Sequence, residues 1–387
     1  VSGGLSSTSP PTPPTPPPPH CQDLPSSIQL LARHGARHTG KPSDLTELGT
    51  ELIELGSPLP WLRNYSYPGN EEVANNLIEM GKEEHKGIGA RLGTLFGEGF
   101  FEDYNPNFLM INSTTLSRTG QSATSFCSGA GIDAPFVRMD STGRDDILRF
   151  YDHCEAWDDN ADSAAAPYKS YAKTRDFKSA LEEFSTLAEL PPGVIISAEQ
   201  FNRAFEACAY DLILSSQTEE WCSLFSEGSL DVANYVTDLK KFYSYGPGFS
   251  INRDFTAFLV KSIIEGLESD TKGTLRFAHA ETVIPFLSAI GIFDGQEPLG
   301  DVRRPDRSFK MNEIAPFSAN VVLAKYSCKG DSEDLVKFLV NEAEITTVRG
   351  CNGNVYCPVS SFKSAVSDLL ERAQTNSLDE ICTAHEN

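Results

Sequence analysis

A histidine between two arginines, in the sequence Arg33-His34-Gly35-Ala36-Arg37, is the segment best suited to carry chemistry. Arginine guanidinium groups bind phosphate oxygens through pairs of hydrogen bonds. No Asp or Glu occurs in residues 24–43, so His34 should lose its proton easily, and its neutral ring nitrogen could then attack phosphorus. The segment predicts phosphate chemistry with His34 as nucleophile. A basic surface loop is the alternative that these five residues leave open.

A second pair of titratable residues, His279 and Glu281, lies far along the chain in His-Ala-Glu. His279 could donate a hydrogen bond to phosphate, and Glu281 could protonate a departing alkoxide. Zinc deaminases also use His-x-Glu, but with Pro-Cys-x-x-Cys downstream. Here Cys351 and Cys357 are separated by five residues and no proline precedes Cys351, so we discard the interpretation as a deaminase.

Arg118, in Ser-Arg-Thr-Gly-Gln-Ser-Ala, is a third candidate, and residues 104–132 around it contain no acidic residue. By itself, such an arginine is more often a surface residue. Its place shortly after an apolar run gives it a role only if the fold brings it to His34.

The elements that must position these residues are short apolar runs that end in polar residues. Residues 28–33, 108–112, 274–278 and 320–326 are predicted strands, with helical patterns between them, such as the stripe at 88–96. This alternation predicts an α/β fold with a doubly wound, mainly parallel sheet and helices on both faces. Ligands bind at the carboxyl ends of such strands, where the candidate residues are expected.

The stretch 145–268 differs because only helical spacing recurs in it. We therefore expect an inserted all-α cap domain at 145–268 within an α/β core of residues 21–144 and 269–387. Residues 1–20 are Pro-, Ser- and Thr-rich and predict a disordered stalk.

The composition excludes several classes of function. The 387 residues carry a net charge of −22, which argues against nucleic acid and anionic membranes as partners. The longest apolar stretch, 283–293, is too short to span a bilayer. No heptad repeat or distinctive exposed stripe is visible, and we expect a monomer.

Cysteine usage points to an oxidising compartment. Nine cysteines without a Cys-x-x-Cys pair favour disulfides, and sequons at Asn64 and Asn112 suggest glycosylation. The chain begins at Val1 without an apolar signal core, so we interpret it as a mature secreted or lumenal chain whose signal peptide is gone.

Together the motifs resemble the histidine acid phosphatase family, whose signature is R-H-G-x-R-x-P with a distant H-D or H-A-E. The H-A-E form looks like the branch of multiple inositol polyphosphate phosphatases, which act as phytases. The further segments that look like this branch are Arg149–Glu155, Cys208–Leu212, Trp221-Cys222, Tyr235–Phe242, His279–Leu287 and Ala315–Asn320. One position departs from the signature, because Thr39 stands where the family has proline, which leaves the shape of this loop in doubt.

The resemblance implies hydrolysis of phosphomonoesters of inositol polyphosphates such as phytate, without metal or cofactor. His34 would form a phosphohistidine, and Glu281, with a raised pKa, would protonate the leaving oxygen. The residues implied to hold the phosphate oxygens are Arg33, Arg37, Arg118 and His279. A broad-specificity acid phosphatase or phosphoglycerate-type phosphatase is the first alternative, and a noncatalytic phosphate-ligand binding protein is the second.

The net negative charge requires a local positive field to bind phytate. We hypothesise that Lys41, Arg144, Lys169 and Lys173 contact its distal phosphates, although each alone is more often a solvated surface residue.

The resemblance also implies how the cysteines pair. The implied disulfides are Cys21–Cys328, Cys208–Cys222, Cys351–Cys357 and Cys154–Cys382. They leave Cys127 unpaired, with burial as its expected role.

Overall fold

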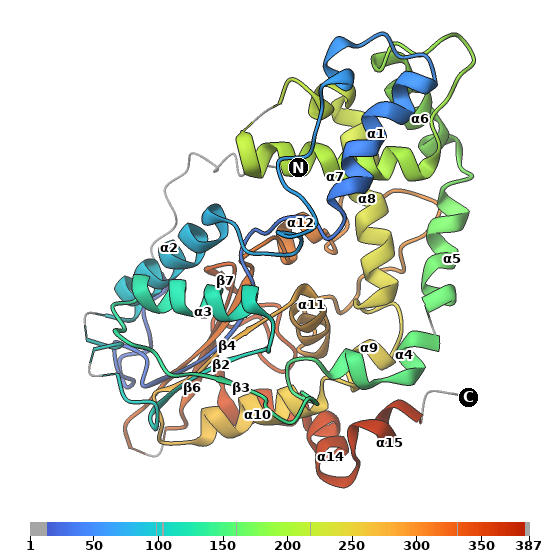
Figure 1. Cartoon of the computed structure of the whole chain (residues 1–387). Helices are drawn as coiled ribbons and strands as arrows, with labels where there is room; N and C mark the ends of the chain where they lie inside the picture. Colours follow the sequence, from blue (N-terminus) through green and yellow to red (C-terminus); the bar gives the residue numbers. More distant parts are fainter. Residues whose placement is uncertain are drawn as a thin grey trace.

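The computed structural model describes residues 14–383 apart from 98, 103, 160, 217 and 331. In Figure 1 an α/β part occupies the lower left and a helical part rises above it to the upper right. The predicted α/β fold class is confirmed.

A mixed eight-stranded sheet forms the centre of the α/β part, in the order β3-β2-β4-β1-β5-β6-β7, with β8 paired to β6. The strands are β1 (Ser27–Arg33), β2 (Leu109–Ser113), β3 (Val137–Met139), β4 (Gly273–Ala278), β5 (Asn320–Tyr326), β6 (Leu335–Val340), β7 (Ala343–Ile345) and β8 (Tyr356–Pro358). The four predicted strands are β1, β2, β4 and β5. The expected parallel arrangement holds from β3 to β1, whereas β5 to β8 pair antiparallel.

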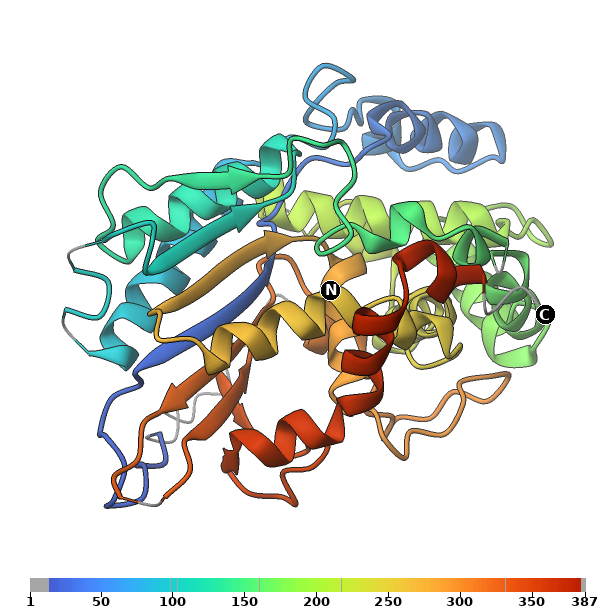
Figure 2. The same ribbon diagram turned by 90° about the horizontal axis from the view of Figure 1, so that it is seen from below.

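Helices cover both faces of this sheet because its strands are apolar on both sides (Figure 2). Leu30 in β1 packs with the residues of α2 (Glu79–Phe96) and α3 (Ser117–Gly129), and its neighbour Leu31 packs in the cluster on the opposite face. On that opposite face, α10 (Ala257–Glu268) contacts β1 and β4 and also α14 (Ser367–Thr375). This part also contains α11 (Ala280–Ala289) and α13 (Val359–Ala365), whereas α12 (Met311–Ile314) and α15 (Leu378–Thr383) pack against helices of the helical part.

The helical part departs from the expected limits 145–268 at two places. Its elements are α1 (Pro42–Glu54), η1 (Pro60–Arg63), η2 (Phe150–His153), α4 (Glu155–Asp159), α5 (Ala161–Tyr171), α6 (Arg175–Leu187), α7 (Ala198–Ser215), η3 (Trp221–Leu224), α8 (Glu227–Ser244) and α9 (Ile251–Asp254). Helix α1, expected in the core, packs on α7, while α10, expected in the cap, packs on the sheet. The limits taken from the sequence assigned both helices to the wrong part, because the apolar stripe of a helix shows that one face is buried but not which element covers it.

The expected disordered stalk also needs correction where it is described. Residues 1–13 lie outside the described residues, but Thr15 binds the sheet: its hydroxyl donates to Glu344 Oε2 at 2.7 Å, and its carbonyl accepts from Lys337 Nζ at 2.9 Å. This short segment is therefore held at the β6–β7 edge.

The four disulfides join Cys21 to Cys328, Cys154 to Cys382, Cys208 to Cys222 and Cys351 to Cys357, which are the pairs that the resemblance implies. Cys127 is a free thiol, and burial raises its pKa to about 12. None of the helices in the described residues has the length and apolarity that crossing a membrane requires.

Candidate active site

His34 lies directly after β1, where the chain leaves the sheet. Its Nδ1 is 2.9 Å from the Gly35 carbonyl oxygen. A carbonyl can only accept, so the proton belongs on Nδ1 and the lone pair on Nε2 is left for nucleophilic attack. Burial and the neighbouring Arg33 charge hold the pKa of His34 well below its usual range, which keeps the ring neutral. The geometry and charge state are those that a nucleophilic histidine needs.

Three arginines from two strand ends lie close together: the charges of Arg33 and Arg118 act on His34, and Arg37 is beside both of these arginines. Arg33 ends β1, Arg37 follows in the same loop, and Arg118 lies in the first turn of α3, after β2. The Nε of each is buried and has no hydrogen-bond partner in the described part of the chain. Burial lowers the pKa of Arg33 to about 10 and that of Arg118 in the same direction. These donors can be satisfied by a phosphate group, which accepts several hydrogen bonds at once.

Packing fixes the orientation of Arg33. Its Nη1 donates to the Ala315 carbonyl at 2.6 Å, and its guanidinium carbon lies 4.3 Å from the centre of the Phe317 ring. The same phenyl ring lies 5.8 Å from His34, centre to centre. The segment 315–319, which precedes β5, therefore supports both residues.

His279 and Glu281 enter the site from the next parallel strand. His279 is the N-cap of α11, after β4, and its ring centre lies 5.4 Å from that of His34. Its Nε2 is 3.0 Å from the hydroxyl of Thr114, which follows β2. Burial, reinforced by Arg118, lowers the pKa of His279 to about 3. The N-terminus of α11 adds a positive dipole end that favours a bound anion.

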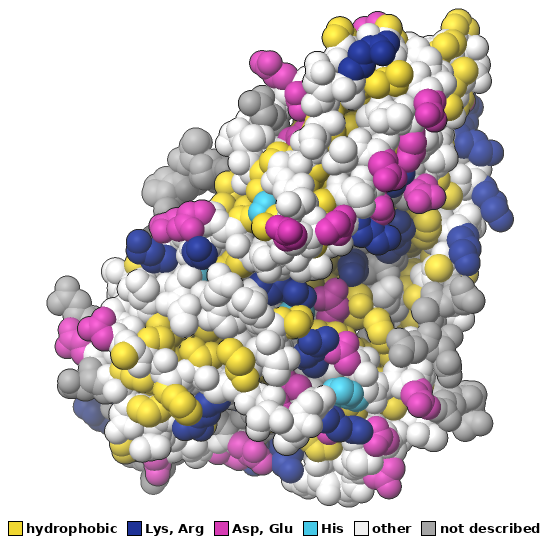
Figure 3. Space-filling view, viewed as in Figure 1, with side chains coloured by type: hydrophobic (Ala, Val, Ile, Leu, Met, Phe, Trp, Pro, Cys, Tyr) yellow, Lys and Arg dark blue, Asp and Glu magenta, His cyan; other side chains and the backbone are white. Residues whose placement is uncertain are grey.

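Lys241, on α8 of the helical part, is a site residue that the sequence analysis missed. Its Nζ lies 3.5 Å from Glu281 Oε1 and 4.6 Å from the centre of the Tyr245 ring. Figure 3 shows Lys and Arg side chains gathered between the two parts of the molecule, with acidic side chains beside them. The only sequence signal for Lys241 was its place in a family-like segment.

In the ligand-free protein Glu281 has a lowered pKa, whereas the raised pKa expected above refers to a carboxylate beside bound phosphate. Burial raises its pKa, but Lys241, Arg33 and His279 together outweigh burial and lower the pKa to about 2. Glu281 is thus ionised in the ligand-free protein. A phosphate bound among these cations would oppose their effect, because it adds negative charge beside the carboxylate.

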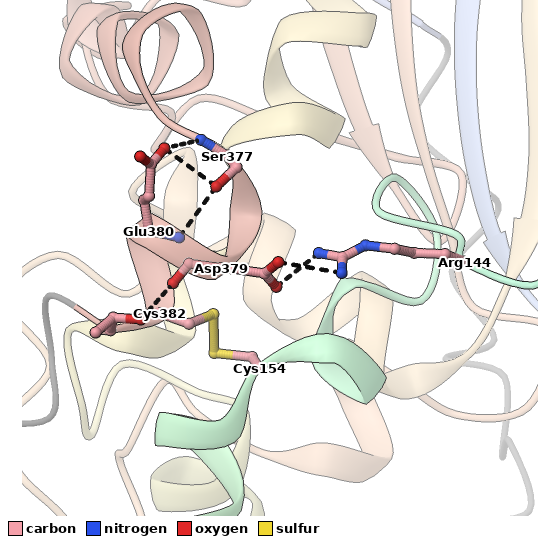
Figure 4. Close-up of a disulfide and its surroundings, with 7 residues drawn as sticks. Arg144, Cys154, Ser377, Asp379, Glu380 and Cys382 are labelled. Atoms are coloured by element: carbon pink, nitrogen blue, oxygen red, sulfur yellow. Dashed lines mark hydrogen bonds and ion pairs between the residues drawn. A yellow bond between two sulfur atoms is a disulfide. The ribbon is translucent and has the colours of Figure 1, made fainter.

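The four residues expected at distal phosphates differ in their exposure and in their partners. Arg144 is bound by two carboxylates, Asp146 Oδ1 at 2.8 Å and Asp379 Oδ1 at 2.7 Å, as Figure 4 shows for Asp379. Its charge is thus paired with two carboxylates in the ligand-free protein, and a contact from Arg144 to a distal phosphate stays a prediction. Lys41 is exposed and lies 3.6 Å from Asp44, and Lys169 and Lys173 are exposed as well.

Thr39, the residue that replaces the signature proline, connects the catalytic loop to the helical part. Its hydroxyl donates to Glu206 Oε1 on α7 at 2.8 Å, and its N–H donates to the Tyr67 hydroxyl at 3.0 Å. Proline could form neither bond, because it has no N–H and no hydroxyl. In this chain the loop is shaped by hydrogen bonds.

The two sequons occupy unlike positions. Asn64 is exposed after η1, as glycan attachment requires. Asn112 is half-buried in β2, paired with β3 and β4, so we correct the expectation of a glycan there.

Comparison with known proteins gives a family and several relatives. The sequence profile of the histidine phosphatase superfamily (branch 2) matches residues 26–341. Multiple inositol polyphosphate phosphatase 1 from Gallus gallus is 26% identical over 92% of this chain and 84% of its own length, and that from Homo sapiens is 24% identical over 92% and 77%.

Solved structures share the fold. The phytase from D. castellii aligns with a TM-score of 0.76 at 22% identity, covering 96% of this chain and 83% of its own. The multiple inositol polyphosphate phosphatase of Bifidobacterium longum in complex with inositol hexasulfate aligns with a TM-score of 0.72 at 16% identity, covering 91% and 93%.

Proposed function

The chain belongs to branch 2 of the histidine phosphatase superfamily, and from that premise we propose that it removes phosphate from inositol polyphosphates such as phytate. The observation that carries this proposal is the neutral His34 ring, with Nε2 unprotonated, beside a group of three arginines whose buried Nε–H groups have no hydrogen-bond partner among the described residues. The names of the relatives support the substrate class.

The proposed reaction has two steps. His34 Nε2 attacks phosphorus in line, the ester P–O bond breaks, and Glu281 gives a proton to the departing inositol oxygen. Arg33, Arg37, Arg118 and His279 hold the phosphoryl oxygens while this happens. Water then cleaves the P–N bond of the phosphohistidine, Glu281 accepts a proton from that water, and inorganic phosphate leaves.

The protonation of Glu281 is part of this proposal. Because its pKa is about 2 in the ligand-free protein, substrate must bring the proton or raise this pKa. Phosphate bound close to Lys241 would draw the ammonium group away from Glu281 and so raise the pKa of the carboxyl. The distal contacts first hypothesised, from Lys41, Arg144, Lys169 and Lys173, remain proposals.

A secreted or lumenal location is part of the same proposal. The four disulfides support it, since such bonds persist in oxidising compartments. A monomeric state remains a prediction.

The test is phosphate release from phytate between pH 4 and pH 7 with EDTA present. Wild type should release phosphate, His34→Ala should not, and His153→Ala, a histidine of η2, should behave as wild type. Activity on small monoesters but not on phytate would favour the broad acid phosphatase. Phytate binding without turnover of either substrate would favour a binding protein.

A further inference from the structure

Helix α2 lies directly against the loop that carries the nucleophile. A Cβ atom on Gly35 would be only 2.3 Å from the carbonyl oxygen of Gly81, in the first turn of α2. Two glycines thus allow the backbones of the loop and the helix to touch. This contact brings the side chains of the next helical turn within reach of the loop.

Glu84 uses this proximity to bind the catalytic loop. Its Oε2 accepts from the backbone N–H of Ala36 at 3.0 Å and from the Ser318 hydroxyl at 2.7 Å. The N–H of Ser318 in turn donates to the His34 carbonyl at 3.0 Å. Both partners of the Glu84 carboxylate therefore belong to segments that hold His34.

The Ala36 N–H and the Gly35 carbonyl are two ends of one peptide group, which is planar and conjugated. The Gly35 carbonyl accepts from His34 Nδ1, and the Ala36 N–H donates to Glu84. A continuous chain of hydrogen bonds thus runs from the carboxylate through the peptide to the imidazole. Hydrogen bonds in such a chain polarise one another. A negatively charged carboxylate that accepts from the N–H therefore makes the carbonyl of the same peptide a stronger acceptor.

We propose that Glu84 is a positioning residue that acts on the nucleophile through the Gly35–Ala36 peptide. By strengthening the bond from Nδ1–H to the carbonyl, it keeps the His34 proton on Nδ1 and increases electron density on Nε2. No proton is transferred along the chain. The catalytic meaning of this arrangement rests on the proposed function, but the hydrogen bonding does not.

The adjacent residue has a separate task. The buried ring of His85 lies with Nε2 3.0 Å from the Arg33 carbonyl oxygen, so it holds the backbone of an arginine rather than the peptide that orients His34. Gly81, Glu84 and His85 are spaced by three and four residues and share one face of α2. Through these three residues the helix contacts Gly35, Ala36 and Arg33, and of the three only Glu84 has an acidic side chain.

The experiment combines a spectroscopic and a kinetic readout on Glu84→Gln and Glu84→Ala. Nitrogen NMR of histidine-labelled protein without substrate, with the His34 signals assigned through His34→Gln, reports which ring nitrogen carries the proton. Wild type should show the proton on Nδ1, and both Glu84 variants should show a population protonated on Nε2. With p-nitrophenyl phosphate, kcat should fall by about 10- to 100-fold, and KM should change little because the arginines remain.

Glu83→Gln is the matched control, because Glu83 is the preceding residue of α2, carries the same charge and has a side chain that is 61% exposed. It should match wild type in both readouts. The proposal is overturned if the Glu84 variants keep the wild-type His34 spectrum. This holds if kcat is unchanged, and it also holds if kcat falls together with the unfolding temperature, because the loss of activity then reflects a less stable protein. The NMR readout needs no substrate, so its outcome stands even if wild type fails to hydrolyse phytate.

Discussion

Glu281 faces Lys241 and Arg33 in the ligand-free site, an arrangement that makes it an anion rather than a ready acid. If it nevertheless protonates the leaving oxygen, its importance must depend on how basic that oxygen is. Glu281→Gln should lower kcat/KM for phytate by about 10²- to 10⁴-fold. The loss in kcat/KM should be much smaller for p-nitrophenyl phosphate, because the weakly basic p-nitrophenolate leaves without needing a proton.

The comparison of the two substrates is the measurement, and Glu313→Gln, at an exposed carboxylate on α12, is the control for loss of a charge. Equal losses on phytate and on p-nitrophenyl phosphate would show that Glu281 does not act as the proton donor.

The reactive groups could be predicted from sequence because each follows the end of a strand, as with His34 after β1 and His279 after β4. The types of these residues and their positions after predicted strands were enough to identify them as candidates. Lys241 and Glu84 could not be predicted in the same way, since their positions depend on how α8 and α2 pack against the loop. The raised pKa expected for Glu281 beside bound phosphate stays a prediction, whereas its lowered pKa in the ligand-free protein could not be foreseen because Lys241 was missing from the argument.

The loop after β1 is joined to α7 by Thr39, whose two hydrogen bonds replace the rigidity of a proline ring. Thr39→Val should cost about 1 kcal/mol in the free energy of unfolding, because Glu206 loses a donor. Thr39→Pro should cost more, about 2 kcal/mol, because Tyr67 also loses the N–H that it accepts. Urea unfolding measures both.

Thr39→Ser is the control, because it keeps the hydroxyl and the N–H, and it should stay close to wild type. A Thr39→Pro variant more stable than wild type would contradict this account of the loop.

Secondary structure followed from sequence where an element is long and its pattern is regular. The strands β1, β2, β4 and β5 lie within one residue of the predicted ranges. The strands β3, β7 and β8 have three residues each, too few for a pattern to appear. Helix α1 was assigned to the wrong part because its apolar stripe predicts burial and leaves the partner, α7, undetermined.

At the scale of the whole molecule, the site depends on two parts staying together. The α/β part supplies His34 and Glu281, and the helical part supplies Lys241. The disulfide Cys154–Cys382 links residues 228 positions apart and ties the C-terminal helix α15 to the junction of η2 and α4 in the helical part (Figure 4). Conditions that loosen the helical part should therefore affect the site.

A buried carboxyl group inside the helical part makes the stability of the protein depend on pH. Asp211, on α7, is buried and accepts from the Tyr65 hydroxyl at 3.1 Å, while its Oδ2 has no partner in the described residues. Burial raises its pKa to about 6 from an ordinary value near 3.8. The folded protein therefore binds this proton more tightly than the unfolded chain does. The contribution of protonated Asp211 to the free energy of unfolding is fully present below about pH 4 and is lost as the pH rises through 6.

Asp211→Asn should remove this dependence, because an amide is neutral at every pH and its oxygen can still accept from Tyr65. Relative to wild type, the variant should gain on the order of 2 kcal/mol in the free energy of unfolding between pH 4 and pH 7. Urea unfolding at both pH values measures that gain, and any pH-independent effect of the substitution cancels in the difference. Asp301→Asn, at an exposed carboxylate, should shift stability equally at both pH values. An Asp211→Asn variant that loses stability relative to wild type as the pH rises would mean that the carboxylate is stabilised as an anion in the fold.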